Sequence, residues 1–88
     1  MPVRLTLLVR AYCHLCDEMQ EALAAVATAT PVDVIDVDAP AHAALEASWG
    51  DAVPVLFAGA PSPANELCRY RLDPARVSAA LASSGEIR

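Results

Sequence analysis

Lysine is absent from this sequence of 88 residues, and the six arginines that carry its positive charge are scattered along the chain. Acidic residues outnumber them, so the formal net charge is -5 at pH 7. Nucleic acids and anionic membranes are bound through clusters of positive charge, and the sequence contains no such cluster. We therefore expect neither nucleic acid nor a membrane among the partners of this chain.

Long apolar runs are also missing. A membrane-spanning helix needs roughly 20 apolar residues, and the run "LTLLV" near the N-terminus is too short even for the core of a signal peptide. These absences predict a cytoplasmic protein. With 56% hydrophobic and 19% charged residues, the chain has enough apolar material for one core. We expect a single monomeric domain over residues 1–88, with a frayed tail at 83–88.

Cysteine is scarce, and its count of three is odd. An odd count leaves at least one thiol without an intramolecular partner. In a cytoplasmic protein, thiols more often serve catalysis, metal binding or burial than a disulfide framework. Two of the three lie three positions apart in "RAYCHLCDEM", as Cys13 and Cys16. This spacing suits a redox couple, half of a metal site, or two buried thiols that happen to be close.

Extended and helical patterns alternate along the chain. Runs rich in leucine and β-branched residues predict strands, and apolar residues three and four positions apart predict helices. Strands are expected at 3–10, 32–38, 53–57 and 66–71, and helices at 13–27, 38–49 and 73–82. The order βαβαββα favours an α/β fold whose four-stranded mixed sheet carries helices on both faces and ends in an antiparallel hairpin. Trp49 and Phe57 are expected in its core.

Individual residues mark the ends and faces of these elements. Asp38 and Asp73 are suited to cap helix N-termini, since each is followed by a proline near the first turn, and Gly50 is suited to end the second helix. The alternation of apolar residues breaks within the second strand, which predicts that this strand is covered on both faces or bulged. In the fourth strand, Cys68 and Tyr70 are expected to face the core together.

Two local signatures combine with this order of elements. The pair "CHLC" lies between the first strand and the first helix, and Val53 and Pro54 open the third strand. Together they resemble the thioredoxin fold, and most closely the compact glutaredoxin-like proteins that share C-x-L-C-D-E and G-D-x-V-P-V-L, here "CHLCDE" and "GDAVPVL". The resemblance covers nearly the whole chain. It implies a thioredoxin-like fold and a thiol–disulfide oxidoreductase.

The resemblance and the chemistry of thiols also assign roles to residues. A thiolate attacks a disulfide, and a helix N-terminus favours that anion. Cys13, just before the helix, is therefore expected to be the nucleophile, and Cys16, one turn deeper, the resolving thiol. In the resembled fold the bond before the proline at Pro54 is cis, and Val53 offers its backbone N–H and C=O to an extended substrate.

Two departures from the glutaredoxin pattern concern the substrate. Glutaredoxins typically carry C-P-Y-C where this chain has C-H-L-C. They also carry a Gly-Gly-x-x-Asp segment, which holds one end of glutathione, where this chain has "YRLDPAR". The resemblance therefore does not imply that glutathione is the substrate. The thiol or disulfide partner is either glutathione, as a co-substrate, or a protein disulfide, and no cofactor is expected.

Three residues near the cysteine pair are candidates for substrate binding, each with a plainer alternative. Tyr12 either lines the substrate groove or packs on the sheet edge. His14 either favours the Cys13 thiolate through its charge or is simply exposed. Arg10 either attracts an anionic thiol substrate or is a solvated residue at the end of a strand.

Two rival functions use the same fold. One is a binding module, whose groove beside the proline holds a protein partner without redox turnover. The other is a metal carrier that uses the cysteine pair. Structural zinc needs four ligands, and the residues that would complete the set, His14, His42 and Cys68, lie on three separate elements. We therefore expect no metal, and we expect Cys68 to be a buried structural cysteine.

Overall fold

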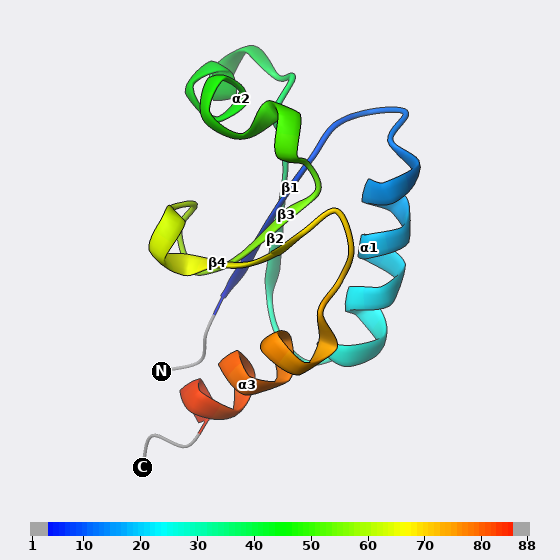
Figure 1. Ribbon diagram of the computed structural model, residues 1–88, viewed down its shortest axis with the longest axis vertical. Coiled ribbons are helices and arrows are strands. Elements are labelled where there is room, and N and C mark those ends of the chain that lie inside the picture. The colour runs from blue at the N-terminus through cyan, green and yellow to red at the C-terminus, as the bar shows by residue number, and fades with distance from the viewer. Residues whose placement is uncertain (1–3, 86–88) are drawn as a thin grey trace.

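The protein, seen here as a computed structural model that describes residues 4–85, is built on one sheet with the strand order β2-β1-β3-β4 (Figure 1). The strands are β1 (Leu5–Val9), β2 (Val32–Asp36), β3 (Val55–Ala58) and β4 (Glu66–Arg69). β1 pairs in parallel with β2 and antiparallel with β3, and β3 pairs antiparallel with β4. The predicted four-stranded mixed sheet with a final antiparallel hairpin is confirmed.

Within residues 4–85, three α-helices and three short 3-10 helices accompany the strands, and α3 follows the last of them. The α-helices are α1 (His14–Val26), α2 (Ala43–Trp49) and α3 (Pro74–Gly85), and the 3-10 helices are η1 (Pro40–His42), η2 (Gly50–Ala52) and η3 (Pro63–Asn65). α1 and α2 lie on opposite sides of the sheet, as Figure 1 shows. The predicted thioredoxin-like arrangement is therefore confirmed. No helix of the described residues is both long and apolar enough to cross a membrane.

Two apolar clusters fill the faces of the sheet. On the face covered by α1 and α3, the buried residues are Leu5, Leu7, Met19, Leu23, Ala27, Leu56, Leu67 and Val77. On the face covered by α2 they are Leu8, Val37, Ala52, Val55 and Phe57, with Ile35, Leu45, Trp49 and Val53 packed against them. Neighbouring residues of β1 and β3 therefore point to opposite clusters. Because both faces of β1 are covered, its sequence is almost uniformly apolar.

β2 is an edge strand, and its two faces contact different clusters, in line with one of the two predicted alternatives: Val32 packs against the cluster under α1 and α3, and Ile35 against the cluster under α2. It lies at the end of the strand order, and Val34 is 49% exposed. The strand ends at Asp36, earlier than predicted, and the apolar residue that follows, Val37, enters the cluster under α2. Its alternation breaks inside the strand, between Val34 and Ile35, because β2 contributes apolar side chains to both clusters. The irregular register lies instead between β3 and β4, next to Leu56 and Phe57.

Two residues at the ends of strands behave differently from the prediction. β4 ends at Arg69, and Tyr70 turns out of the strand with a positive φ of 69°. Tyr70 is exposed, so the prediction that it faces the core with Cys68 is wrong. Asp38 does not cap a helix, because the N-cap residue of the following helix η1 is Ala39 and no side chain caps that helix.

The two longer helices match the prediction except at their ends. Val26, the last residue of α1, is exposed, whereas the next residue, Ala27, is buried just after the helix ends. α3 starts directly after Asp73, as predicted, and continues to Gly85. The tail predicted to be frayed is therefore helical over 83–85. Residues 1–3 and 86–88, which include the first residue of the predicted N-terminal strand and the last three of the predicted tail, lie outside the described part of the chain.

The start of α3 gives a testable expectation. Oδ1 of Asp73 accepts a hydrogen bond from the backbone N–H of Arg76 at 3.2 Å, which satisfies one of the free donors of the first turn. Asp73→Ala should therefore lower the free energy of unfolding by about 0.5–2 kcal/mol, measured by chemical denaturation. Asp51→Ala removes an exposed carboxylate that caps no helix, and should change it by less than about 0.5 kcal/mol. Equal losses in the two variants would show that the cap does not stabilise α3.

Candidate active site

The cysteine pair lies at the junction between β1 and α1. Cys13 is the N-cap residue of α1 and has extended backbone angles (φ -114°, ψ 107°). Its Sγ accepts a hydrogen bond from the backbone N–H of Cys16 at 3.1 Å. The two Cα atoms are 5.2 Å apart, and the two sulfur atoms are joined as a disulfide. The helix start therefore holds the two thiols in contact.

The two cysteines differ in their access to solvent. Cys13 is half-buried, whereas Cys16 is 1% exposed. Cys16 belongs to the inward stripe of α1, together with Met19 and Leu23. An incoming disulfide can therefore reach the first cysteine, while the second is reached only from within the protein.

The electrostatic surroundings of Cys13 favour a thiolate in the reduced protein. The first-turn N–H groups and the helix dipole place partial positive charge at its sulfur, and the N–H of Cys16 is directed at it. Asp17, an exposed acidic residue of the first turn, opposes this effect through like-charge repulsion. His14 is exposed at the start of the helix, so solvent screens any charge it carries.

Tyr12 precedes the pair and extends into solvent. It is fully exposed, and its φ of 59° lies in the left-handed region. The alternative in which Tyr12 packs on the sheet edge is therefore wrong. Its role in lining a substrate groove stays a prediction.

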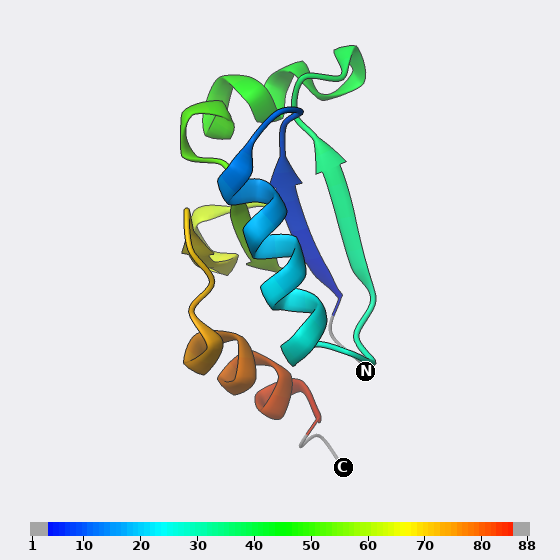
Figure 2. The same ribbon diagram turned by 90° about the vertical axis from the view of Figure 1, so that its right-hand side faces the viewer.

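The segment before β3 lies beside the start of α1 in both views (Figures 1 and 2). The Val53–Pro54 peptide bond is cis. Pro54 is buried, and its carbonyl accepts a hydrogen bond from the backbone N–H of Tyr70 at 2.9 Å. The pairing of β3 with β1 begins only at Val55, which leaves the backbone of Val53 outside the ladder. Val53 is thus placed where a backbone contact to a substrate is expected.

Arg10, at the end of β1, is held by acidic residues. Its Nη2 lies 3.2 Å from Oε2 of Glu46 and 3.5 Å from Oδ1 of Asp38, which ties the loop before the cysteines to α2. A β-carbon on Gly50 would lie 2.6 Å from that Glu46 oxygen and 2.8 Å from Nη2, so a larger residue there would displace the ends of these two side chains. The two carboxylates offset the charge of Arg10, which weakens the prediction that it attracts an anionic substrate.

Cys68 lies apart from the disulfide, on β4. It is a free thiol, half-buried, and packs against the cluster under α1 and α3. Burial raises the pKa of the Cys68 thiol, which disfavours the reactive thiolate at neutral pH. Within residues 4–85, no group of three or more His, Cys, Asp or Glu side chains is placed to hold a metal ion.

The structure also contains a groove that the sequence patterns did not predict, between α1 and the segment after β4. Its volume is about 310 Å³, and its lining includes Glu18, Met19, Ala22, Tyr70, Arg71 and Leu72. Tyr70 was expected in the core and Arg71 within the fourth strand, yet both are exposed. The one signal in the sequence was "YRLD", where the Gly-Gly segment of glutaredoxins is replaced by two large residues.

The sheet, its helices and the dithiol at the start of α1 define a protein of the thioredoxin-fold class. The profile of the Glutaredoxin-like domain (DUF836) matches residues 4–82, so the chain belongs to this family and the resemblance found in its motifs is confirmed.

Two solved structures are similar to this chain over nearly its whole length. One is the X-ray structure of a structural genomics target protein from X. campestris, which is 38% identical with a TM-score of 0.64, and the match covers 90% of this chain and 96% of that one. The other is the solution NMR structure of a protein from Nitrosomonas europaea, which is 35% identical with a TM-score of 0.75, and the match covers 92% and 93% of the two chains. None of the curated proteins matches this chain.

Proposed function

We propose that the protein is a thiol–disulfide oxidoreductase in which Cys13 is the nucleophile and Cys16 the resolving thiol. The observation that carries the proposal is the unequal placement of the two sulfurs at one helix start. Cys13 is accessible and accepts an N–H bond, and Cys16 is buried one turn deeper. Membership of the glutaredoxin-like family supports the same chemistry.

The reductive reaction has two displacement steps. The Cys13 thiolate attacks one sulfur of the substrate disulfide, a mixed disulfide forms as the substrate bond breaks, and the departing sulfur takes a proton from solvent. Cys16 then loses its proton and attacks Sγ of Cys13, which releases the second substrate thiol. The substrate has gained two electrons, and the protein holds a Cys13–Cys16 disulfide. A thiol reductant, either glutathione or a protein dithiol, regenerates the reduced pair.

The half-buried Cys68 is given no part in this reaction. Its raised pKa and its packing against the core both reduce its reactivity. The substrate is a disulfide of a protein or of glutathione. We place the reaction in the cytoplasm, where thiol reductants are available.

Equilibration in glutathione buffers of increasing oxidation tests the proposal. After denaturation and alkylation, mass spectrometry should find that the three alkylated cysteines of the reduced protein fall reversibly to one. Peptide mapping should place the bridge between Cys13 and Cys16, with Cys68 alkylated throughout. A dominant bridge that includes Cys68, or a pair that never oxidises, would contradict the proposal.

A further inference from the structure

In the described part of the chain, two residues other than glycine have positive φ angles, and both are tyrosines: Tyr12 (59°) and Tyr70 (69°). They are the two tyrosines of the sequence. Bulky residues are disfavoured in this left-handed region, which glycine and asparagine enter more easily. Such backbone persists only where the surrounding structure fixes it, and it is concentrated at functional sites.

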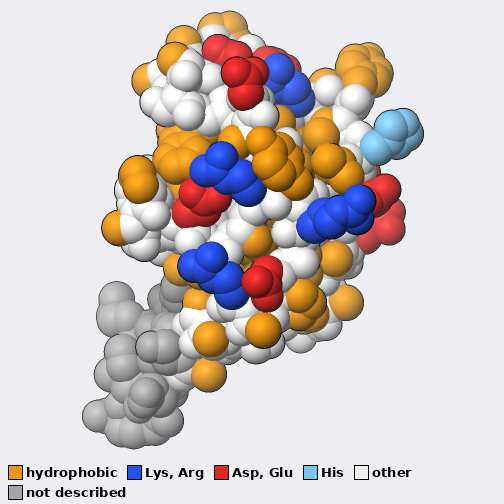
Figure 3. All heavy atoms as spheres, in the orientation of Figure 1, with side chains coloured by type: hydrophobic (Ala, Val, Ile, Leu, Met, Phe, Trp, Pro, Cys, Tyr) orange, Lys and Arg blue, Asp and Glu red, His pale blue; other side chains and the backbone are white. Residues whose placement is uncertain are grey.

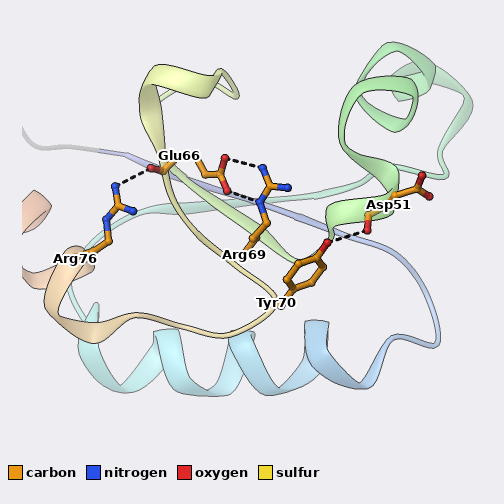
Figure 4. Close-up of polar contacts among 5 residues, drawn as sticks. All are labelled: Asp51, Glu66, Arg69, Tyr70 and Arg76. Carbon is orange, nitrogen blue, oxygen red and sulfur yellow. Dashed lines mark hydrogen bonds and ion pairs between the residues drawn. The ribbon is translucent and has the colours of Figure 1, made fainter.

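One tyrosine adjoins the dithiol and the other lines the groove beside α1, and both leave their rings exposed. Tyr12 directly precedes Cys13 and is fully exposed. Tyr70 is 44% exposed, although the segment before β3 holds it at both ends. Its backbone N–H donates to the carbonyl of Pro54 at 2.9 Å, and its hydroxyl donates to the carbonyl of Asp51 at 3.4 Å (Figure 4). The ring of Tyr70 is therefore fixed in orientation and still available for contact.

Arg71, the next residue, differs from the other described arginines. The other four use their guanidinium groups within the fold: Arg4 with Asp33, Arg10 with Glu46 and Asp38, Arg69 with Glu66, and Arg76 with the Glu66 carbonyl. Among residues 4–85 the guanidinium of Arg71 has no hydrogen bond or ion pair. It lines the groove of about 310 Å³ beside α1. Figure 3 shows arginine side chains interspersed with hydrophobic ones on this face of the molecule.

We propose that Tyr12, Tyr70 and Arg71 form a docking surface for a polypeptide substrate that carries an acidic side chain close to its reactive cysteine. This inference rests on the proposed redox function and specifies its substrate. Tyrosine and arginine are enriched at the centres of protein interfaces, because they offer large contact areas with defined geometry. Arg71 supplies the matching charge, since a guanidinium binds a carboxylate through two parallel hydrogen bonds.

The position of the surface favours a polypeptide over a small thiol. Tyr12 lies on the loop before α1, whereas Tyr70 and Arg71 lie on the segment after β4, so the proposed surface spans two separate loops. A polypeptide is long enough to contact both loops, and a small thiol is not. Glu18 lines the same groove as Arg71, from α1. Its charge repels an acidic side chain of the substrate, which therefore binds on the side of the groove that Arg71 forms.

Binding of two matched peptides tests the docking surface without requiring turnover. Each peptide carries one S-methylated cysteine, and they differ only in an aspartate or an asparagine two positions away. NMR titration should show chemical-shift changes at Tyr12 and Tyr70, and the aspartate peptide should bind about two- to five-fold more tightly at low salt, as expected for one exposed ion pair. Arg71→Ala should bring the ratio of the two peptide affinities to one, and Glu18→Gln should increase this ratio. Raised salt should reduce it.

Matched variants separate the contribution of the Arg71 charge to peptide binding from that of the two tyrosine rings. Arg4→Ala removes the same charge from an exposed residue at the opposite end of β1, and should keep the ratio. Tyr12→Asn and Tyr70→Asn keep residues that tolerate a left-handed backbone, and should weaken both peptides equally. The proposal is overturned if Arg71→Ala keeps the ratio, or if both tyrosine variants bind as tightly as the native protein.

The outcome for the docking surface is distinct from that for the redox function. If the protein reduces disulfides but binds the two peptides equally, the docking surface is wrong and the oxidoreductase stands. If it reduces no disulfide yet prefers the aspartate peptide through Arg71, the surface stands and the redox proposal fails.

Discussion

Cys13→Ser is expected to lower the rate of disulfide reduction by about three orders of magnitude or more, because it removes the nucleophile on which both displacement steps depend. A serine hydroxyl stays protonated at neutral pH and does not attack a disulfide sulfur. The helix start should survive the change, since serine is among the best N-cap residues and its oxygen can accept the N–H bond that the Cys13 sulfur now accepts. The rate is measured with a peptide disulfide and an excess of a thiol reductant.

Cys16→Ser is expected to behave differently from Cys13→Ser. The first displacement remains possible, and the second does not, so a mixed disulfide should accumulate at Cys13. Mass spectrometry of the intact protein would detect the added substrate half, and peptide mapping would locate it. Cys68→Ser serves as the control and should retain the native rate, because Cys68 lies apart from the dithiol on β4.

The two variants also distinguish the assigned order from its reverse. An inactive Cys16→Ser protein without an adduct, together with an adduct trapped in Cys13→Ser, would exchange the roles of the two thiols. Because Cys16 is 1% exposed, its substitution carries a larger risk to the fold. Circular dichroism of each variant shows whether the fold is retained, so that a lost rate in a folded variant is assigned to the missing thiol.

The features that could be predicted from the sequence are those set by short-range signals. The apolar run of β1, the helical spacing of α1 and the Asp73 cap of α3 each depend on residues within one element. The spacing of Cys13 and Cys16 at a strand-to-helix junction is of the same kind. For this reason the α/β sheet and the position of the dithiol followed from the pattern, while the thioredoxin-like fold was implied by the resemblance of the motifs.

The features that were missed depend on partners that are distant in sequence. Val34 has the residue type of a buried strand, and only the place of β2 at the sheet edge exposes it. The charge of Arg10 is offset by Glu46 and Asp38, which α2 and its preceding turn bring close. Tyr70 turns outward because its N–H bonds the Pro54 carbonyl, a contact that no local pattern contains.

Phe57→Ala is expected to have the largest effect on stability, about 3–5 kcal/mol of the free energy of unfolding. Phe57 is fully buried on β3, and its ring meets Trp49 edge-on at a centroid distance of 4.9 Å. Truncation leaves a cavity between the sheet and α2, and it removes the aromatic contact that holds α2 in place. A small domain has a total stability of about 5–15 kcal/mol, so the variant should lose a large share of it in chemical denaturation.

Val34→Thr is the matched control for Phe57→Ala, since it alters an apolar side chain of the same sheet that is half exposed on β2. Its cost should stay below about 1 kcal/mol, because the new hydroxyl remains solvated. Phe57 belongs to β3, and the segment that precedes β3 carries Val53 and Pro54 beside the dithiol. If Phe57→Ala unfolds no more easily than Val34→Thr, the α2 cluster does not stabilise β3, and the placement of Val53 and Pro54 must depend on other contacts, such as the Tyr70 hydrogen bond.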